Sequence, residues 1–253
     1  MDLENKKILI TGASTGIGKA IAERLSKEKC KMILTARRIE LLDELKKQLN
    51  IEDENIITIR CDVSKKSEVE GAFKIVKEKF GNIDVVILNA GIGHNMKVDE
   101  YNSRYAEEIF GANVFGIIYW VEQLLPGFLK KKNGIIVGVS SLADNRGYSG
   151  SGFYCASKAA ASFYLEGLRV ELKPYNVKVI TIKPGFVKTP MTDKNKFAMP
   201  FLMPAEKAAD IIVNGIKKEK RIIQFPLQMV LLTRLIGLMP GVVYEWLASR
   251  VRV

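Results

Sequence analysis

Short apolar runs alternate along this chain with longer segments in which apolar residues recur every three or four positions. Most of the short runs are rich in β-branched residues and uninterrupted by charge, which is typical of strands covered on both faces. They predict the following strands: Lys7–Thr11, Lys31–Thr35, Ile56–Cys61, Val85–Leu88, Gly134–Val139, Lys178–Ile182 and Ile222–Phe225.

The longer periodic segments predict helices between these strands. Their ranges are Gly18–Lys29, Glu40–Leu49, Lys66–Phe80, Ser103–Leu129, Gly152–Lys173 and Ala205–Lys217. This alternation favours an α/β fold, with a Rossmann-like, doubly wound parallel sheet of about seven strands and helices on both faces. Ligands of such sheets bind at the carboxyl ends of the strands, so the polar motifs that follow strands are the candidate site residues.

A glycine-rich turn follows the first predicted strand. It reads Thr11-Gly12-Ala13-Ser14-Thr15-Gly16-Ile17-Gly18 and leads directly into the first predicted helix. Glycines let the backbone approach a phosphate closely, and a helix N-terminus offers unpaired N–H groups and a positive dipole. The order strand, glycine turn, helix therefore predicts a nucleotide site.

A second candidate site lies in the segment around Tyr154 and Lys158. On a helix these two residues are one turn apart on the same face, so a phenol and an ammonium can share a ligand. A nearby ammonium is expected to lower the pKa of the tyrosine towards neutrality. Ser141, thirteen residues before Tyr154, adds a hydroxyl that can hold a carbonyl oxygen, and Ser140 is the alternative for this role.

These motifs together resemble the short-chain dehydrogenase/reductase family, in its single-domain branch, over residues 6 to about 225. The turn from Thr11 to Gly18 resembles the family's cofactor turn, and Asn89-Ala90-Gly91 its motif after the fourth strand. Asn113, Ser141, Tyr154 and Lys158 match its catalytic tetrad, and Pro184-Gly185-Phe186-Val187-x-Thr189 matches the loop after its sixth strand.

The resemblance implies hydride transfer between a nicotinamide and a carbonyl or alcohol carbon. In reduction Tyr154 would protonate the nascent alkoxide, Ser141 would hold its oxygen, Lys158 would bind the nicotinamide ribose, and Asn113 would support a water-linked proton path. The residues that would hold the cofactor are Gly12, Ser14, Thr15, Gly16, Ile17, Gly18, Arg37, Asp62, Val63, Asn89, Ala90, Gly91, Tyr154, Lys158, Pro184, Gly185, Val187 and Thr189.

The end of the second predicted strand indicates which cofactor is preferred. An NAD site needs a carboxylate there for the ribose, but Leu34 to Arg38 contains no acid. A guanidinium can instead fork onto the extra phosphate of NADP, which makes Arg37 the expected ligand, while Arg38 either helps or is only solvated. Thr15 stands where many NADP-dependent relatives carry a basic residue. Asp62 either contacts the adenine or caps the next helix.

Length and composition fit one globular domain, since 253 residues with 47% hydrophobic content can bury a large core. We expect residues 1–225 to form the catalytic domain and residues 226–253 to be a C-terminal apolar and basic helical extension of it. The cysteines at 30, 61 and 155 show no spacing pattern, so neither a disulfide nor a metal site is expected. The N-terminus lacks a basic-then-apolar pattern, which predicts a cytoplasmic protein.

The sequence indicates less about the substrate than about the cofactor. The segment from Pro190 to Met203 contains methionines and phenylalanines that either bind a large apolar ligand or pack a lid onto the core. His94, the single histidine, is expected in a solvated loop at the cleft mouth. Asp144 and Asn145 lie near Ser141, where relatives often carry small residues.

Three roles are open for the apolar run from Phe225 to Pro240 and the residues after it: a helix over the cleft, a dimer contact, or a segment at a membrane interface. The run is too short and too interrupted for a membrane span. The net charge of +11 favours anionic surfaces or substrates, while no nucleic-acid motif is present. Family resemblance implies a homodimer or homotetramer formed through the two long helices.

The leading hypothesis is an NADPH-dependent reductase of a lipophilic ketone or aldehyde. A second enzyme hypothesis is a 3-oxoacyl thioester reductase of fatty-acid metabolism, which the basic surface would suit. The hypothesis from another class is a non-catalytic NADP(H)-sensing or interaction protein, which would have no need of Tyr154.

Overall fold

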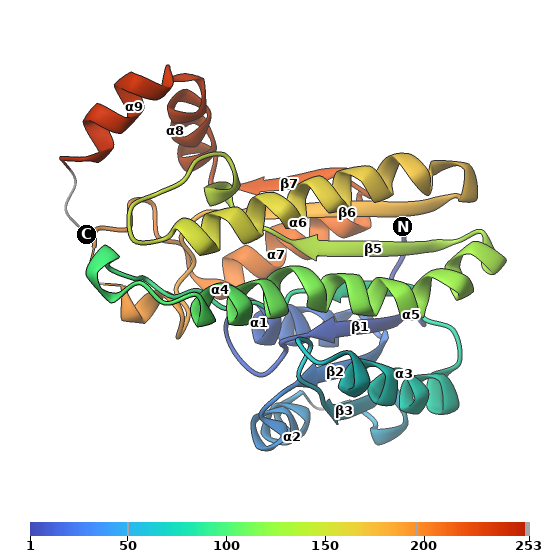
Figure 1. The fold of residues 1–253 in the computed structure, drawn as a ribbon. Helices are drawn as coiled ribbons and strands as arrows, with labels where there is room; N and C mark the ends of the chain where they lie inside the picture. Colours follow the sequence, from blue (N-terminus) through green and yellow to red (C-terminus); the bar gives the residue numbers. More distant parts are fainter. Residues whose placement is uncertain (50, 196, 251–253) are drawn as a thin grey trace.

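The computed structural model describes residues 1–49, 51–195 and 197–250. Lys196 of the segment from Pro190 to Met203, and residues 251–253 of the predicted extension, lie outside the described residues. One parallel sheet with the order β3-β2-β1-β4-β5-β6-β7 runs through the molecule (Figure 1). Its strands are β1 Lys7–Thr11, β2 Lys31–Ala36, β3 Ile56–Arg60, β4 Val85–Leu88, β5 Gly134–Val139, β6 Val177–Pro184 and β7 Ile222–Phe225.

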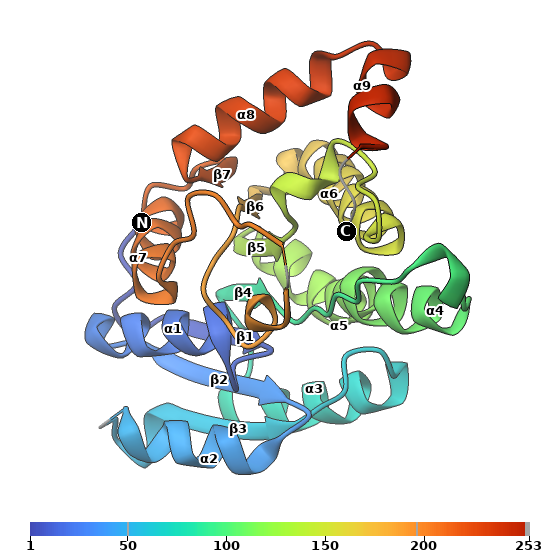
Figure 2. The same cartoon turned by 90° about the vertical axis from the view of Figure 1, so that its left-hand side faces the viewer.

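Helices cover both faces of this sheet, as the alternating pattern predicts. Their bounds are α1 Gly16–Leu25, α2 Ile39–Gln48, α3 Lys66–Phe80, α4 Arg104–Phe110, α5 Gly116–Lys131, α6 Gly152–Glu171, α7 Ala205–Lys217, α8 Leu227–Leu238 and α9 Gly241–Ala248. Side chains of α1, α2 and α7 form one hydrophobic core with the sheet, and those of α3, α5 and α6 form the other. Figure 2 shows these layers end-on, with α8 and α9 arching away from them.

The strand order reverses direction between β1 and β4. Both strands carry apolar residues that are fully buried because helices cover both faces, which explains why their sequences lack polar alternation. At this switch point the two crossover connections diverge to opposite faces and leave a crevice at the carboxyl ends. The fold therefore opens a site where the glycine turn and the Asn89-Ala90-Gly91 motif meet.

The predicted helix Ser103–Leu129 is one continuous helical run from Arg104 to Lys131 with an unexpected feature. Between α4 and α5, residues Gly111–Phe115 form a π-helical turn. Such turns widen a helix locally and are frequent at functional sites, and this one contains Asn113. By length and composition this run could span a membrane, but Trp120 and its neighbours pack on the sheet as part of the core.

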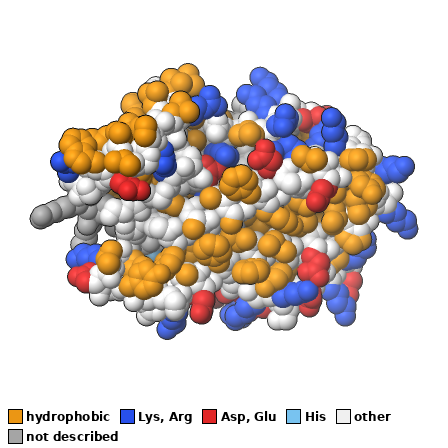
Figure 3. Space-filling view, turned by 45° about the horizontal axis from the view of Figure 1, so that its top comes forward, with side chains coloured by type: hydrophobic (Ala, Val, Ile, Leu, Met, Phe, Trp, Pro, Cys, Tyr) orange, Lys and Arg blue, Asp and Glu red, His pale blue; other side chains and the backbone are white. Residues whose placement is uncertain are grey.

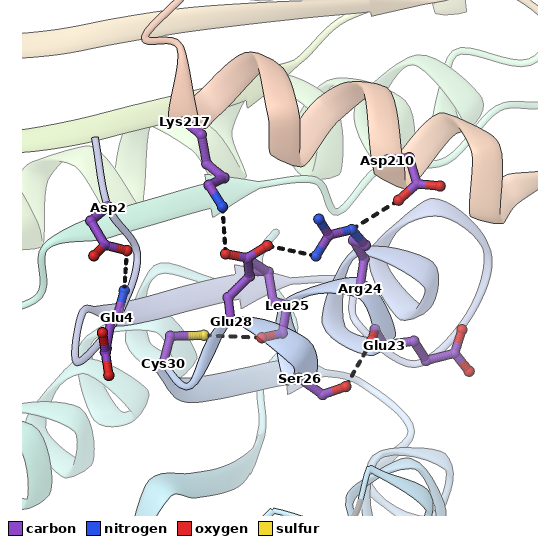
Figure 4. A network of polar contacts seen from close by, with 10 residues as sticks. All are labelled: Asp2, Glu4, Glu23, Arg24, Leu25, Ser26, Glu28, Cys30, Asp210 and Lys217. Carbon is purple, nitrogen blue, oxygen red and sulfur yellow. Dashed lines mark hydrogen bonds and ion pairs between the residues drawn. The ribbon is translucent and has the colours of Figure 1, made fainter.

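Ion pairs join α1 to α7 on one face of the sheet (Figure 4). Glu28 accepts from Arg24 at 2.7 Å and from Lys217 at 2.7 Å, while Arg24 also reaches Asp210 at 2.8 Å. The Lys217 ammonium, with Arg24 behind it, lowers the pKa of the Glu28 carboxyl. The Glu28 carboxylate therefore connects α1, which begins at the glycine turn, to α7.

Gly138 in β5 allows α6 to lie close to the sheet. A Cβ atom at this position would lie 2.3 Å from Cδ1 of Leu165, which is itself fully buried and cannot move aside freely. We expect Gly138→Ala to lower the free energy of unfolding by about 1–3 kcal/mol through overpacking. Thermal or urea unfolding of the wild type and the variant measures the difference in the free energy of unfolding.

Gly71→Ala is the matched control, because no heavy atom lies within 4 Å of its added Cβ and the position is an exposed part of α3. Removing a glycine from a helix interior should stabilise the protein by about 0.5–1 kcal/mol. A Gly138→Ala protein as stable as the wild type would contradict the packing argument.

Candidate active site

The glycine turn after β1 has a backbone that only glycine adopts easily. Gly12 and Gly16 have φ values of 67° and 59°, in the left-handed region. A Cβ on Gly12 would lie 2.8 Å from Cα of Ala90, and one on Gly18 would lie 2.3 Å from the Gly12 carbonyl oxygen. The turn is thus pressed directly against the backbone that follows β4.

Polar contacts hold the two motifs together. The Asn89 side-chain amide donates to the carbonyls of Thr11 at 3.0 Å and Gly12 at 3.2 Å. In the other direction, the Thr11 hydroxyl accepts from the backbone N–H groups of Asn89 and Ala90, each at 3.0 Å. Asn89 therefore positions the turn as well as the end of β4.

The first turn of α1 points its N–H groups into the crevice. Thr15 stands at the N-cap, and within the described part of the chain its side chain does not cap the helix. Instead its hydroxyl accepts from the Arg38 guanidinium at 3.3 Å. Arg38, which the sequence left open between helper and solvated residue, therefore lies beside the predicted phosphate turn.

Asn113 is fully buried in the π-helical turn and connects three elements. Its amide oxygen accepts from the Ile92 N–H at 2.8 Å, and its amide nitrogen donates to the Ile92 carbonyl at 3.0 Å and to the Ser157 hydroxyl at 2.9 Å. A Cβ on Gly91 would lie 3.0 Å from Oδ1 of Asn113 and 3.3 Å from Nζ of Lys158. Sequence reasoning found Asn113 but missed Ser157, whose part in this network has no motif of its own.

The two adjacent serines after β5 have different surroundings. The Ser140 hydroxyl donates to the carbonyl of Lys158 at 2.8 Å and lies 2.8 Å from the Ser162 hydroxyl, so it ties β5 to α6. The Ser141 hydroxyl accepts from the Ala143 N–H at 3.1 Å and lies beside the Tyr154 phenol. This geometry favours Ser141 over Ser140 as the hydroxyl available to a ligand.

Tyr154 and Lys158 lie one turn apart on α6, as predicted; Lys158 is buried, and Tyr154 is half-buried in the cavity wall. The Lys158 ammonium donates to the Val139 carbonyl at 2.9 Å and lies 5.7 Å from the centre of the Tyr154 ring. Burial lowers the pKa of Lys158 to about 8.

The expected lowering of the tyrosine pKa by Lys158 is not what the structure shows. Burial raises the pKa of Tyr154, and contact with the Ser141 hydroxyl opposes the rise only in part. The physical reason is that desolvation of the phenolate is the largest effect on this pKa, while the Lys158 ammonium is turned towards the Val139 carbonyl.

Asp144 adds a buried charge behind these groups. Its carboxylate pairs with Lys183 at 2.6 Å and accepts from the Ser162 hydroxyl at 2.5 Å. The negative charge of Asp144 raises the pKa of Lys158, whereas burial lowers it more strongly. The unusual acid noted in the sequence is therefore part of the site's electrostatics.

A cavity of about 720 Å³ collects most of the predicted residues. Those that line it are Gly12, Ser14, Thr15, Gly16, Ile17, Arg37, Asp62, Val63, Asn89, Ala90, Gly91, Ser141, Tyr154, Lys158, Pro184, Gly185, Val187 and Thr189. Gly18 and Asn113 do not line it, because both are packed behind the wall. Residues that the sequence did not single out include Arg104, Glu108 and Ile92. The first two form an i, i+4 ion pair at 2.9 Å, a spacing visible in the sequence.

Asp62 occupies the cavity wall after β3 and also makes a local turn. Its carboxylate accepts from the N–H of Ser64 at 3.1 Å and from its hydroxyl at 2.7 Å. Lys65 stands at the N-cap of α3 and, among the described residues, the Asp62 carboxylate bonds only to Ser64, so the expectation that Asp62 caps this helix is wrong. Its place in the cavity wall leaves the adenine contact as the remaining expectation. Among the described residues, no group of His, Cys, Asp and Glu could hold a metal ion.

Backbone hydrogen bonds join the two ends of the segment that follows β6. Lys188 donates its N–H to the Met203 carbonyl at 2.8 Å, and Met203 donates to Phe186 at 3.0 Å. Met203 is buried, whereas Met191 lines the cavity and is half exposed. Both expected uses of these apolar residues, core packing and cleft lining, are thus present in one segment.

The profile described as short chain dehydrogenase matches residues 6–199. The chain belongs to this family. It is similar to an uncharacterized oxidoreductase of Myxococcus xanthus, at 32% identity over 99% of both chains. It is also similar to an NADP-dependent 3-hydroxy acid dehydrogenase of Schizosaccharomyces pombe, at 35% identity over 74% of this chain and 73% of that one.

A solved short-chain dehydrogenase/reductase from Burkholderia phymatum, in complex with NAD, has the same fold. The TM-score is 0.86 at 22% identity, and the match covers 100% of this chain and 98% of the other. The protein is thus an oxidoreductase of the short-chain dehydrogenase type with a Rossmann-like fold.

A nicotinamide dinucleotide fits the described cleft. The added Cβ of Gly12 or Gly16 would crowd the turn that a pyrophosphate has to approach, and the N-terminus of α1 supplies N–H donors there. The cavity continues from this turn to Tyr154 and Lys158, so the two ends of such a ligand would meet the two motifs.

The buried ammonium of Lys158 should cost stability in a pH-dependent way. The unfolded chain binds its proton up to about pH 10.5 and the folded protein up to about pH 8, so the free energy of unfolding rises between these values. The penalty is complete below pH 8. We expect Lys158→Met to stabilise the protein at pH 7 on the order of 1 kcal/mol, since the lost bond to Val139 offsets part of the gain.

Urea unfolding at pH 7 and pH 10 measures the effect, and the stabilisation should shrink at the higher pH. Lys74→Met, at an exposed position of α3, is the control and should change stability little at either pH. Equal gains of Lys158→Met at both pH values, or a loss at pH 7, would show that the ammonium is not desolvated in this way.

Proposed function

We propose that this protein is an NADPH-dependent oxidoreductase that reduces a lipophilic ketone or aldehyde to an alcohol. The observation that carries the proposal is the meeting of Ser141, Tyr154 and Lys158 in the same cavity as the glycine turn. A phenol, a hydroxyl and an ammonium at the nicotinamide end of a dinucleotide site are the groups that carbonyl reduction needs.

Each residue has a definite task in this proposal. Bound NADPH supplies the hydride. The Ser141 hydroxyl orients the carbonyl oxygen, and Tyr154 donates a proton to that oxygen as negative charge develops. The raised pKa of Tyr154 keeps the phenol protonated at neutral pH, which suits a proton donor. Lys158 binds the ribose. Asn113 fixes the position of Lys158 through its hydrogen bonds to Ile92 and to Ser157 of α6.

Two arginines support the preference for NADP. Arg37 and Arg38 follow β2 and line the cavity, and Arg38 also contacts Thr15 of the phosphate turn. A guanidinium pairs well with a phosphate, whereas a carboxylate at this position would repel it. The similarity to an NADP-dependent relative agrees with this preference.

The apolar lining beside Tyr154 supports a lipophilic substrate. Met191 faces the cleft, and the aromatic rings of Phe186 and Phe197 lie 6.0 Å apart in the segment above it. A second candidate is a 3-oxoacyl thioester reductase, which the net charge of +11 favours because acyl carriers are acidic.

The proposal also covers assembly and location. Phe115, Phe163 and Val170 are exposed large apolar side chains on the two long helices, which supports a homodimer or homotetramer formed through them. We place the protein in the cytoplasm, with peripheral membrane contact through its C-terminal segment.

The first test is NADPH oxidation with a series of carbonyl compounds of increasing chain length. We expect turnover that rises with apolar chain length and falls about a thousandfold in Tyr154→Phe, because phenylalanine has no proton to donate to the alkoxide. Tyr148→Phe is the matched control, since Tyr148 lies near this end of α6 but outside the cavity lining. Tight NADPH binding without turnover on any compound would shift the assignment to a sensing protein.

The second test concerns cofactor choice. We expect Arg37→Ser to raise the KM for NADPH at least about tenfold and to leave the KM for NADH nearly unchanged, because only NADPH carries the phosphate that the guanidinium pairs with. Arg60→Ser is the control, since Arg60 is exposed at the end of the neighbouring strand β3 and does not line the cavity. An equal change for both cofactors would contradict the role of Arg37.

A further inference from the structure

Helix α8 has apolar side chains on both of its faces. One stripe faces the protein, with Val230 and Thr233 buried. The opposite stripe consists of leucines that water reaches: Leu227 at 69%, Leu231 at 52%, Leu235 at 63% and Leu238 at 82% exposure. These positions recur every three or four residues, so they form a continuous apolar ridge. Packing against the protein's own body does not account for a second apolar face.

Helix α9 continues this ridge after a sharp bend. It is turned by 118° from α8 and, among its described residues, buries none. Val242 and Trp246 are 80% and 58% exposed. Figure 3 shows apolar side chains gathered over these two helices, with basic side chains beside them.

The charged residues on the ridge are mostly basic. From Leu227 to Arg250 the sequence contains two basic residues, Arg234 and Arg250, and one acid, Glu245. Arg234 lies on the same outward stripe as the leucines and is exposed. Arg250 stacks on the Trp246 ring at 3.6 Å from its centre, so an aromatic ring and a cation stand together at the rim.

The ridge is held in a definite orientation by the loop that follows Ser141. The Arg146 guanidinium donates to the carbonyls of Ile236 at 3.4 Å and Gly237 at 3.2 Å, and also to that of Met239, at the C-terminal end of α8. Asn145 donates to the Thr233 carbonyl at 2.5 Å.

Helix α9 is held by the same loop. The Tyr244 hydroxyl donates to the Gly147 carbonyl at 2.6 Å, and the Arg146 guanidinium lies over the Tyr244 ring at 5.0 Å. The loop thus presents both helices as a rigid surface at the end of the sheet where the cavity opens.

We infer that α8 and α9 form a docking surface for an anionic lipid membrane, with the leucine ridge and Trp246 inserted among the lipids and the arginines at their headgroups. A second copy of the chain fits this surface less well, because a two-fold contact would place this basic patch against an identical basic patch. Lipid instead accommodates apolar side chains that wrap around a bent pair of helices. The inference deepens the peripheral contact included in the proposed function, and its test needs no substrate, so the two can fail separately.

The test is sedimentation of the full-length protein with vesicles of phosphatidylcholine, either alone or mixed with phosphatidylglycerol. We expect binding to the anionic vesicles that weakens with added salt. Leu235→Gln/Leu238→Gln should lower the partition coefficient at least about tenfold. Arg234→Gln should lower it about fivefold on anionic vesicles and hardly at all on neutral ones.

Val98→Gln/Ile75→Gln is the matched control, since both side chains are exposed and apolar but lie far from α8 in the sequence and outside the ridge. This variant should bind like the wild type. Equal loss of binding in the ridge and control variants would overturn the inference.

Tryptophan fluorescence gives a second readout. Trp120 is fully buried, so a blue shift on adding anionic vesicles reports on Trp246. Trp246→Phe should lose this shift and still sediment with the vesicles. Absence of vesicle binding by the wild type overturns the inference, and a halved mass of Leu235→Gln/Leu238→Gln in light scattering would then assign the ridge to a second copy.

Discussion

The close approach between the glycine turn and the end of β4 is the constraint on which the cleft depends. No side chain fits between Gly12 and Ala90, and the Asn89 amide replaces it with hydrogen bonds to the turn. From there the chain continues to Gly91, which leaves room for both Asn113 and Lys158. The backbone after β4 therefore packs against both the glycine turn and the residues around Lys158.

The catalytic end combines burial with incomplete charge compensation. Lys158 is buried and Tyr154 is half-buried, and desolvation disfavours both the ammonium and the phenolate. Asp144, paired with Lys183, supplies negative charge from behind the helix. Such an arrangement costs folding free energy, as expected where stability is given up for chemistry. The Asn113 network offsets part of this cost, because every polar atom of its amide has a partner.

The C-terminal helices show how one loop can serve two regions. Its first residue, Ser141, faces the cleft, while Asn145 and Arg146 bind the carbonyls of α8. Arg146 acts as a C-terminal cap for a helix that lacks a basic residue in its own last turn. The position of the apolar ridge is thereby coupled to the position of Ser141, although none of the described residues of α8 or α9 lines the cavity.

The sequence by itself determined the fold class, the order of the motifs along the strands and much of the cavity lining, because buried parallel strands and glycine turns are local signals. It also found Tyr154 and Lys158 through their spacing on one helix face, and Ser141 through its distance from Tyr154 in the sequence. Only the tertiary structure decided what depends on burial and long-range contact. It replaced the expected low pKa of Tyr154 with a raised one, since desolvation is a property of the whole packed site. It also revealed the π-helical turn at Asn113. The contacts of Arg146 with α8 join residues about ninety positions apart, so no sequence pattern predicts them.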